Sequence, residues 1–173
     1  MALLLHYELI FHQELVLCDL SELIYCLGRI KFSVDARFRG KEVACLREEA
    51  ERWLKQSKAD MKTAEDCFKD GNYYASAFFC QQAVEKALKA LYIIRRKDFP
   101  PRTHNLLDLS LNLSLPEEVL RVARNLTPEF IVSRYPDAAG GVPAELYDKE
   151  KTERILELTR RFFEWLKKEL EAS

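Results

Sequence analysis

The sequence has no excess of charge of either sign. Charged residues make up 32% of it, but 27 Lys and Arg nearly balance 28 Asp and Glu. No field of the whole molecule therefore draws the protein to nucleic acid, and any contact with RNA must come from a local group of residues.

Paired cysteines are also missing. The cysteines are odd in number, scattered, and never spaced as C-x-x-C: Cys18, Cys26, Cys45, Cys67 and Cys80. Neither a disulfide framework nor a zinc site follows from this pattern, which fits a reducing compartment, so we expect a cytoplasmic protein. His6 and His12 have no acidic residue or cysteine at convincing ligand spacing, and we expect no metal and no cofactor.

Long apolar runs are absent as well. Acidic residues interrupt the apolar N-terminal stretch early, so no run of about 18 apolar residues is available to cross a membrane; these are Glu8, Glu14, Asp19 and Glu22. The first residues also lack the basic start of a secretory signal peptide. We expect no membrane contact.

From Leu46 onward the apolar residues recur every three or four positions, the period of one face of an α-helix. We predict a first helix from Leu46 to about Phe68 and a tight turn at Gly71. Asn72 offers an N-cap oxygen for a second helix, which is rich in alanine and continues to Tyr92.

Two further helices are predicted in the middle of the chain. Pro100-Pro101 prevents the second helix from continuing, and Thr103 can cap a short third helix with its hydroxyl. Ser114 and Glu117 have the spacing of a capping box, which predicts a fourth helix that runs to about Asn125.

The last helix is predicted from Ala144 or Glu145 to Leu170. Each helix is apolar on one side and must bury that side against others, and short connections make consecutive helices antiparallel. A chain of 173 residues with 48% hydrophobic residues can form one core. We therefore predict an all-α protein: a four- to five-helix up-and-down bundle over residues 46–173, with no β-hairpin signal and no internal repeat.

Residues 1–45 are predicted to form an N-terminal extension with mixed helical and strand spacing. The extension could cover a face of the bundle or strengthen a dimer. An alternative is that the start codon lies too far upstream and that translation begins near Val43.

The longest break between predicted helices, Ser133–Pro143, carries candidate binding residues: Arg134, Tyr135 and Asp137. Pro136 fixes its own φ and holds Tyr135 extended, so these side chains project in defined directions. A guanidinium can hold a phosphate bidentately, and a phenol ring can stack on a base. The alternative is that Tyr135 packs on the end of the bundle while Arg134 and Asp137 pair locally.

Polar residues of the second helix form another candidate group. Gln81, Glu85 and Lys89 lie on adjoining turns, and Glu85 to Lys89 is a favourable pair. Gln81 and Glu85 either face the bundle or a dimer partner, or belong to the ordinary polar face. For Lys86 and Lys89 the sequence favours a solvated face.

His104 and Arg124 complete the candidates. His104 begins the third helix, where the helix dipole favours a neutral ring that can accept a proton or bind a partner's backbone. It could equally be packed under the loop. Arg124, with Arg121 and the cluster Arg95–Lys97, could contact phosphate, although cations at the end of a helix complement its dipole in any case.

Three motifs follow one another in a defined order: the alanine-rich helix that includes Gln81 and Glu85, then Thr103-His104-Asn105-Leu106, then Ser133-Arg134-Tyr135-Pro136-Asp137. In this order and spacing, from about Leu46 to Leu170, the sequence resembles HEPN domains. The resemblance implies a small helical bundle that commonly dimerises. Many members of that family are metal-independent ribonucleases in toxin–antitoxin or defence systems.

The chain departs from the nuclease pattern of that family, in which an arginine is followed, after four to six residues, by a histidine. No histidine follows His104, so neither Arg124 nor Arg134 has such a partner. The motif that would supply a general base and a general acid is therefore missing.

The sequence is similar to the branch of the family with the Arg-Tyr-Pro-Asp loop, often encoded beside minimal nucleotidyltransferases, and to the helical domain of kanamycin nucleotidyltransferase. This resemblance implies a non-catalytic binding module. A homodimer would offer Arg134 and Tyr135 to a nucleotide or to a nucleotidyltransferase subunit, in a pair like toxin and antitoxin, and RNA is a less favoured ligand. Two alternatives remain open: a metal-independent ribonuclease with an unconventional site, and a purely structural dimeric interaction protein.

Overall fold

The computed structural model describes residues 36–171, and the predictions made for residues 1–35 fall outside them. Helix α2 (Ala36–Lys69) is followed, after a tight turn, by α3 (Tyr73–Arg96). Helix α2 begins ten residues before Leu46, the predicted start. The prediction missed these residues because residues 37–42 carry no apolar stripe that periodicity could detect.

The turn between α2 and α3 depends on a residue in the left-handed conformation. Gly71 has φ +78°, as predicted for the position after a helix C-terminus. The following N–H, of Asn72, donates to the Cys67 carbonyl at 2.8 Å. Asn72 precedes α3, but its side chain makes no capping hydrogen bond. The predicted cap was wrong because φ −84° and ψ 67° differ from the extended conformation that a capping side chain needs.

Small residues allow α2 and α3 to pack closely. Ser57 Oγ on α2 donates to the Ala83 carbonyl on α3 at 2.7 Å, and Ser76 Oγ on α3 donates to the Ala64 carbonyl on α2 at 2.8 Å. All four residues are fully buried. Such bonds to the backbone of a neighbouring helix form only where no large side chain separates the two helices.

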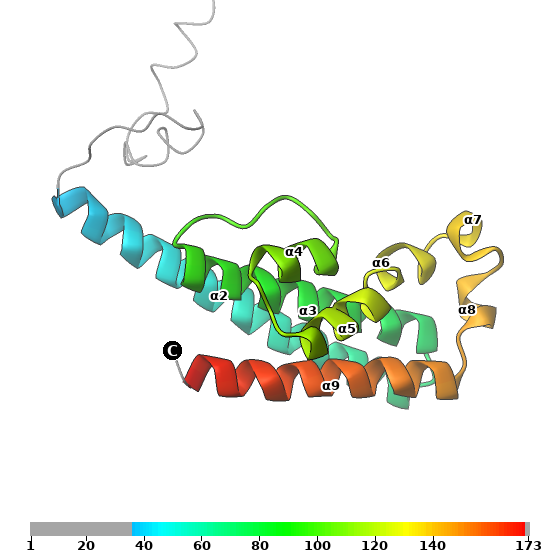
Figure 1. The fold of residues 1–173 in the computed structure, drawn as a ribbon. Helices are drawn as coiled ribbons and strands as arrows, with labels where there is room; N and C mark the ends of the chain where they lie inside the picture. Colours follow the sequence, from blue (N-terminus) through cyan, green and yellow to red (C-terminus); the bar gives the residue numbers. More distant parts are fainter. Residues whose placement is uncertain (1–35, 172–173) are drawn as a thin grey trace, which may run out of the picture. The chain divides into compact units, whose positions relative to one another are not determined.

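The chain then returns along α3 without forming a helix. Lys97 ends α3 in the left-handed conformation, with φ 54°. Residues 97–105, which include two prolines, extend back to the middle of α3, and α4 (Leu106–Asn112) begins there (Figure 1). Helix α4 is therefore parallel to α3: His104 lies beside Glu85, whereas the Leu113 carbonyl accepts from Arg95 near the end of α3. The prediction that consecutive helices are antiparallel was wrong for this pair.

The caps of the middle helices differ from the predictions. The Asn105 side chain caps α4 by accepting from the N–H groups of Leu107 and Asp108. Thr103 Oγ1 instead accepts from the Asn105 N–H at 3.1 Å. Helix α5 (Glu117–Leu126) has no side-chain cap, because Ser114 is in the left-handed conformation with φ 53° and cannot form the predicted capping box.

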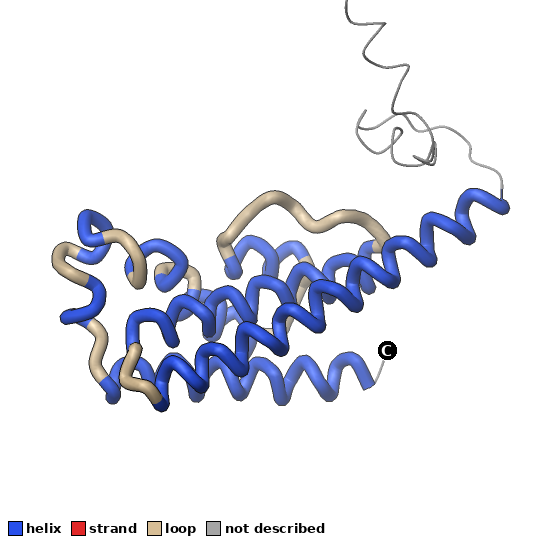
Figure 2. Tube along the Cα trace, turned by 180° about the vertical axis from the view of Figure 1, so that it is seen from behind, coloured by secondary structure: helices blue, strands red, loops and turns tan. Residues whose placement is uncertain are grey.

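Helix α9 (Lys149–Glu171) completes the bundle and runs parallel to α3. Thr152 Oγ1 reaches the Tyr73 carbonyl at one end, and Glu169 pairs with Arg95 at the other. Helix α9 starts later than predicted, because residues 143–146 form a separate turn, α8 (Pro143–Leu146). Figure 2 shows α2, α3 and α9 as three long rods that lie alongside one another.

Short helices close one end of the bundle. Helices α6 (Glu129–Val132) and α7 (Pro136–Ala139) precede α8, so the region predicted as a loop, Ser133–Pro143, contains a helical turn and begins another. Helix α6 packs against α3 and α5. It thereby brings the Arg134 region to the side of α3.

The described residues form one main hydrophobic core between α3, α4, α5 and α9, and they contain no strand. Its largest fully buried side chains include Leu88, Leu91, Leu106, Leu126 and Phe162. The predicted all-α bundle is confirmed, although α4 runs parallel to α3 and not antiparallel to it. No helix in the described part of the chain is long and apolar enough to span a bilayer.

The close approach of α2 and α3 can be tested with Ala83→Leu. The larger side chain has no space beside Ser57, so we expect a loss of about 1–3 kcal/mol in the free energy of unfolding. Urea denaturation measures this loss. Ala59→Leu, the same substitution at an exposed position of α2, is the control and should change stability by less than about 0.5 kcal/mol. Equal effects of the two substitutions would contradict this packing.

Candidate ligand-binding site

The candidate site is centred on a buried carboxylate in the middle of α3. Glu85 is 4% exposed. Its oxygens accept hydrogen bonds from Lys89 Nζ at 2.9 Å and Gln81 Nε2 at 3.1 Å, both on α3. His104 Nδ1 lies 3.1 Å from both oxygens. A carboxylate in this position can only accept, so Nδ1 of His104 carries a proton and donates it.

Gln81 connects the helix to the returning segment. Besides its bond to Glu85, the Gln81 amide donates to the His104 carbonyl at 3.2 Å. One amide group therefore holds both the carboxylate and the backbone of the histidine that binds it. The candidates Gln81, Glu85 and His104, distant or undecided in the sequence, lie together in the structure.

The lysines of α3 are not on a solvated face. Lys89 is 8% exposed, is paired with Glu85 and lies 5.3 Å from the centre of the Trp53 ring. Lys86 Nζ lies 2.6 Å from Asp60 Oδ2 on α2. The prediction of solvated lysines was wrong, because α2 covers this side of α3 and supplies a carboxylate and an indole.

His104 is positioned by an aromatic ring as well as by Glu85. Its imidazole stacks on the Phe130 ring at 4.0 Å between centroids, with 14° between the planes. The imidazole is nevertheless open to solvent, since 58% of the side chain is exposed. With Nδ1 engaged by Glu85, the ring nitrogen left for a ligand is Nε2.

Arg134 lies against the same ring. Its guanidinium carbon is 4.4 Å from the centre of Phe130, 4.6 Å from that of Phe78 and 5.1 Å from that of Tyr135. The Nε–H donates to the Phe130 carbonyl at 2.8 Å. Within residues 44–171 Arg134 forms no ion pair, so the alternative of a local pair with Asp137 is not what the structure shows.

Tyr135 and Asp137 are exposed residues that follow Arg134 in the sequence. Tyr135 has φ −112° and ψ 117°, the extended conformation predicted for a residue before proline. Its side chain is exposed and does not pack into the end of the bundle. Asp137 is exposed in the first turn of α7.

Arg124 is separate from the group around His104. Its Nη1 pairs with Glu117 Oε1 at 2.6 Å, and both side chains are exposed on α5. The predicted basic patch is also divided, because Arg95 and Arg96 bond to the carbonyls of Leu113 and Asn112.

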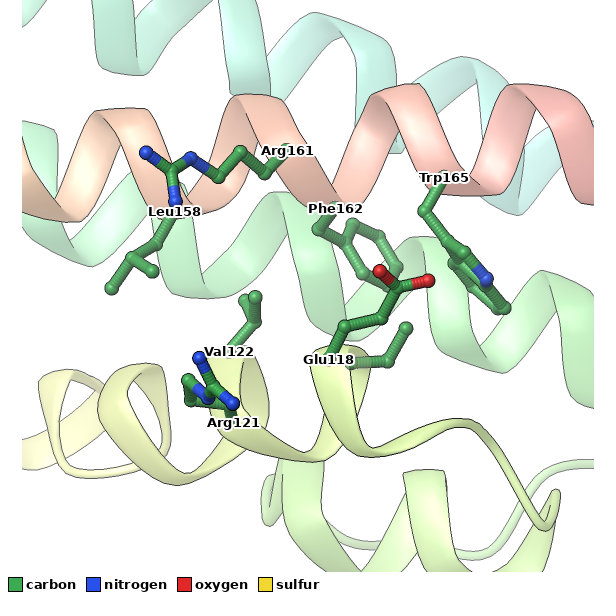
Figure 3. A pocket seen from close by; sticks show the side chains of 8 residues that line it. Glu118, Arg121, Val122, Leu158, Arg161, Phe162 and Trp165 are labelled. Atoms are coloured by element: carbon green, nitrogen blue, oxygen red, sulfur yellow. The ribbon is translucent and has the colours of Figure 1, made fainter.

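A shallow hollow of about 240 Å³ lies between α5 and α9 (Figure 3). Its walls are mainly apolar, with Phe162 and Trp165 on α9, and two arginines, Arg121 and Arg161, flank it. Arg161 is paired with Glu157. The hollow contains none of the predicted site residues, and it is smaller than typical small-molecule pockets of about 300–1,000 Å³.

Sequence reasoning missed the aromatic residues that organise the site. The Phe130 ring contacts both His104 and Arg134, and the Phe78 ring contacts Arg134, yet the two rings lie far apart in the sequence and in different helices. Only the packing of α6 on α3 brings them together. No spacing in the sequence signals this contact.

Comparison with protein families matches residues 50–170 to the HEPN domain. The chain belongs to the HEPN domain family. This match covers the bundle and every predicted site residue.

Individual relatives agree with this assignment. The chain is similar to the Methanocaldococcus jannaschii protein named "Putative toxin MJ1304", with 28% identity over 130 residues, which cover 68% of this chain and 86% of the relative.

Solved structures also resemble this HEPN domain. The crystal structure of TT1696 from Thermus thermophilus has 30% identity and a TM-score of 0.63, and the match covers 69% of this chain and 97% of that one. The crystal structure of ST0689, an archaeal HEPN homologue, has 30% identity and a TM-score of 0.61, with 70% and 97% covered.

Two buried carboxylates of this HEPN domain are shifted in opposite directions. Burial alone would raise the pKa of Glu85, but hydrogen bonds from Lys89, Gln81 and His104 outweigh it and hold the pKa below the ordinary 4.5. Burial raises the pKa of Glu129 on α6, even though the Tyr147 hydroxyl donates to that carboxylate. The charge at Glu85 is therefore stabilised by the fold, whereas the charge at Glu129 is not.

The cysteines of this HEPN domain take no part in the site. Cys45, Cys67 and Cys80 are free thiols. Burial raises the pKa of Cys80 to about 12, so its thiol is protonated and unreactive at neutral pH.

The opposite shifts of the two carboxylates predict opposite pH dependences of stability. A lowered pKa stabilises the fold above the ordinary value of 4.5, and this contribution disappears as the pH falls through the folded-state value. Glu85→Gln should therefore cost about 1–3 kcal/mol at pH 7 and progressively less below pH 4.5.

For Glu129 the raised pKa means that stability falls as the pH rises from 4.5 towards the folded-state value. The free energy of unfolding of Glu129→Gln, relative to that of the wild type, should therefore be higher at pH 7 than at pH 4. Urea denaturation between pH 3 and pH 8 measures both differences. Parallel pH profiles for the two variants would contradict the assignment.

Proposed function

We propose that this HEPN domain is a non-catalytic binding module that takes a nucleotide on the surface formed by His104, Arg134 and Tyr135. The observation that carries the proposal is the state of Arg134. Its guanidinium carbon lies 4.4–5.1 Å from the centres of three aromatic rings, its Nε–H donates to the Phe130 carbonyl, and no carboxylate among residues 44–171 forms an ion pair with it.

An arginine held in this way is suited to phosphate. Fixing one edge of the guanidinium to the backbone leaves the Nη groups for two parallel hydrogen bonds to phosphate oxygens. Because aromatic rings already order the side chain, little conformational entropy remains to be lost on binding. A bound phosphate would also give the Arg134 guanidinium a partner of opposite charge, which no residue among 44–171 supplies.

The neighbouring residues suit the rest of a nucleotide. The exposed Tyr135 ring can stack on a base, and Nε2 of His104 can bond to a sugar hydroxyl or a phosphate oxygen. Glu85 and Lys89 lie behind His104 and are buried, so they would position the imidazole and not contact the ligand.

We further propose that a protein partner covers this surface, either a minimal nucleotidyltransferase or a second copy of the chain. Three large apolar side chains of the segment 131–146 are about half exposed: Ile131, Val142 and Leu146. A protein partner that covered them would remove this apolar surface from water. The toxin in the relative's name is consistent with a paired system, in which catalytic carboxylates would come from the partner.

Calorimetry with ATP and GTP tests nucleotide binding. Arg134→Ala should weaken binding at least about tenfold, equivalent to about 1.4 kcal/mol, because it removes both the charge and the bidentate donor. Arg134→Lys keeps the charge but loses the planar bidentate donor, so its affinity should lie between those of the wild type and Arg134→Ala.

Arg154→Ala is the matched control, because Arg154 is an exposed arginine of α9 paired with Glu150 and distant in sequence from the site. It should bind as the wild type does. The absence of heat with either nucleotide, with and without a nucleotidyltransferase partner, would refute the proposal. Unchanged interactions of Arg134→Ala and Tyr135→Ala would instead favour the purely structural dimer.

A second candidate function is metal-independent cleavage of RNA, and one observation favours it: the Glu85–His104 pair and Arg134 lie against a single ring, Phe130. Sequence reasoning disfavoured a nuclease because no histidine follows an arginine at the family spacing. In support of this candidate, His104 and Arg134 both contact the Phe130 ring, although they are far apart in the sequence.

In this candidate reaction the Nε2 atom of His104 takes the proton of a ribose 2′-hydroxyl, and Glu85 stabilises the resulting imidazolium through Nδ1–H. The 2′ oxygen attacks phosphorus, and the bond from phosphorus to the 5′ oxygen breaks. The leaving oxygen takes a proton from the imidazolium or from water, and a cyclic phosphate remains. Arg134 would neutralise charge on the phosphate.

Cleavage of labelled single-stranded RNA in the presence of EDTA tests this candidate. His104→Gln should lower the rate by about 100-fold or more, because it removes the proton acceptor while keeping a polar side chain. Gln81 and Glu85 stay in place in this variant. Equal rates for the wild type and His104→Gln, or loss of activity on repurification, would show that cleavage comes from a contaminant.

A further inference from the structure

The side chains that hold His104 are connected to a buried ion pair between α2 and α3. Gln81 donates from Nε2 to Glu85 and to the His104 carbonyl, and its Oε1 accepts from Gln82 Nε2 at 2.6 Å. Gln82 Oε1 in turn accepts from Lys86 Nζ at 2.9 Å. Lys86, Gln82, Gln81 and Glu85 are thus connected by one continuous chain of hydrogen bonds.

The chain is anchored on α2. Lys86 Nζ lies 2.6 Å from Asp60 Oδ2, and Asp60 Oδ1 accepts from Gln56 Nε2 at 2.8 Å. Asp60 is 5% exposed. Ser57, one turn before Asp60, donates to the Ala83 carbonyl on α3. This bond fixes the position of Asp60 relative to α3.

The direction of every bond in the chain follows from its two ends. An ammonium group can only donate, so Lys86 requires the oxygen of the Gln82 amide on its side. The Gln82 nitrogen then points to Gln81, which must present its own oxygen there. This leaves the Gln81 nitrogen for Glu85 and the His104 carbonyl. An ionised Glu85 can only accept, and the direction of the chain suits it.

We infer that Asp60 and Lys86 are positioning residues for His104, acting through the side-chain amides of Gln82 and Gln81. Asp60 holds the ammonium group, the ammonium group orients both amides, and the oriented amides hold the carboxylate and the backbone that keep Nδ1 protonated. The Nε2 atom is then presented to solvent as a hydrogen-bond acceptor. This inference rests on the proposed function only in taking His104 as a residue that faces the ligand.

Removing Lys86 frees both amides to rotate. Gln81 can then turn its nitrogen away, and the hydrogen bonds that hold the Glu85 carboxylate and the His104 carbonyl together are lost, so the imidazole can leave the carboxylate. His104 would no longer be held in one tautomer. The form protonated at Nε2, which cannot accept a bond from a ligand, becomes populated.

Imidazole NMR of the full-length chain tests this directly. Two-bond proton–nitrogen spectra of ¹⁵N-histidine-labelled protein distinguish the two tautomers, and His104→Gln identifies the His104 signals. The wild type should show a single tautomer protonated at Nδ1. Lys86→Met and Asp60→Asn should lose this pattern and show averaged nitrogen shifts.

Three further variants make the result specific. Lys86→Arg keeps a group that can only donate and should restore the single tautomer. Lys62→Met breaks an exposed ion pair of α2 that is not part of the chain, and should leave His104 unchanged. If Lys86→Met fails to fold, Gln82→Met interrupts the chain without leaving a buried charge unpaired, and the same loss is expected.

A single Nδ1–H tautomer in a folded Lys86→Met or Gln82→Met variant would overturn the inference. The measurement needs no ligand, so it is independent of the proposed function. Loss of the tautomer without any nucleotide binding would support the positioning role and refute only the proposed function. Nucleotide binding by the wild type, together with an unchanged tautomer in these variants, would support the proposed function and refute the positioning role.

Discussion

The site depends on a carboxylate that is buried inside a bundle. Glu85 lies in an alanine-rich helix at 4% exposure, and an isolated charge in that position would be strongly destabilising. Donors from its own helix and from the returning segment compensate for the lost water: Lys89, Gln81 and His104. The orientation of the histidine, with Nδ1 towards the carboxylate, meets this requirement.

The route of the chain after α3 is what makes the compensation possible. A helix joined to α3 by a short turn would have placed its first residues at the far end of the bundle. Because residues 97–105 instead extend back along α3, His104 reaches the middle of the helix, and α4 begins there under an Asn105 cap. The two prolines of this segment disfavour helix and leave fewer conformations to be ordered.

An aromatic surface links this histidine to the second half of the chain. Phe130 contacts both the His104 ring and the Arg134 guanidinium, so packing against one aromatic ring connects the two polar groups. Membership of the HEPN family accounts for the bundle. The histidine, the arginine and the rings form the surface on which we propose that a nucleotide binds.

The sequence by itself indicated five helices, α2, α3, α4, α5 and α9, together with the tight turn at Gly71 and the family, because helical periodicity and glycine conformation are local properties. It also indicated Arg134, Tyr135 and the extended geometry before Pro136. The tertiary structure alone decided that His104 meets Glu85, that Lys89 is buried and Lys86 pairs with Asp60, and that α4 is parallel to α3. These features depend on which helix covers which face, a choice made by the packing of residues distant in the sequence, and short-range patterns carry no information about it.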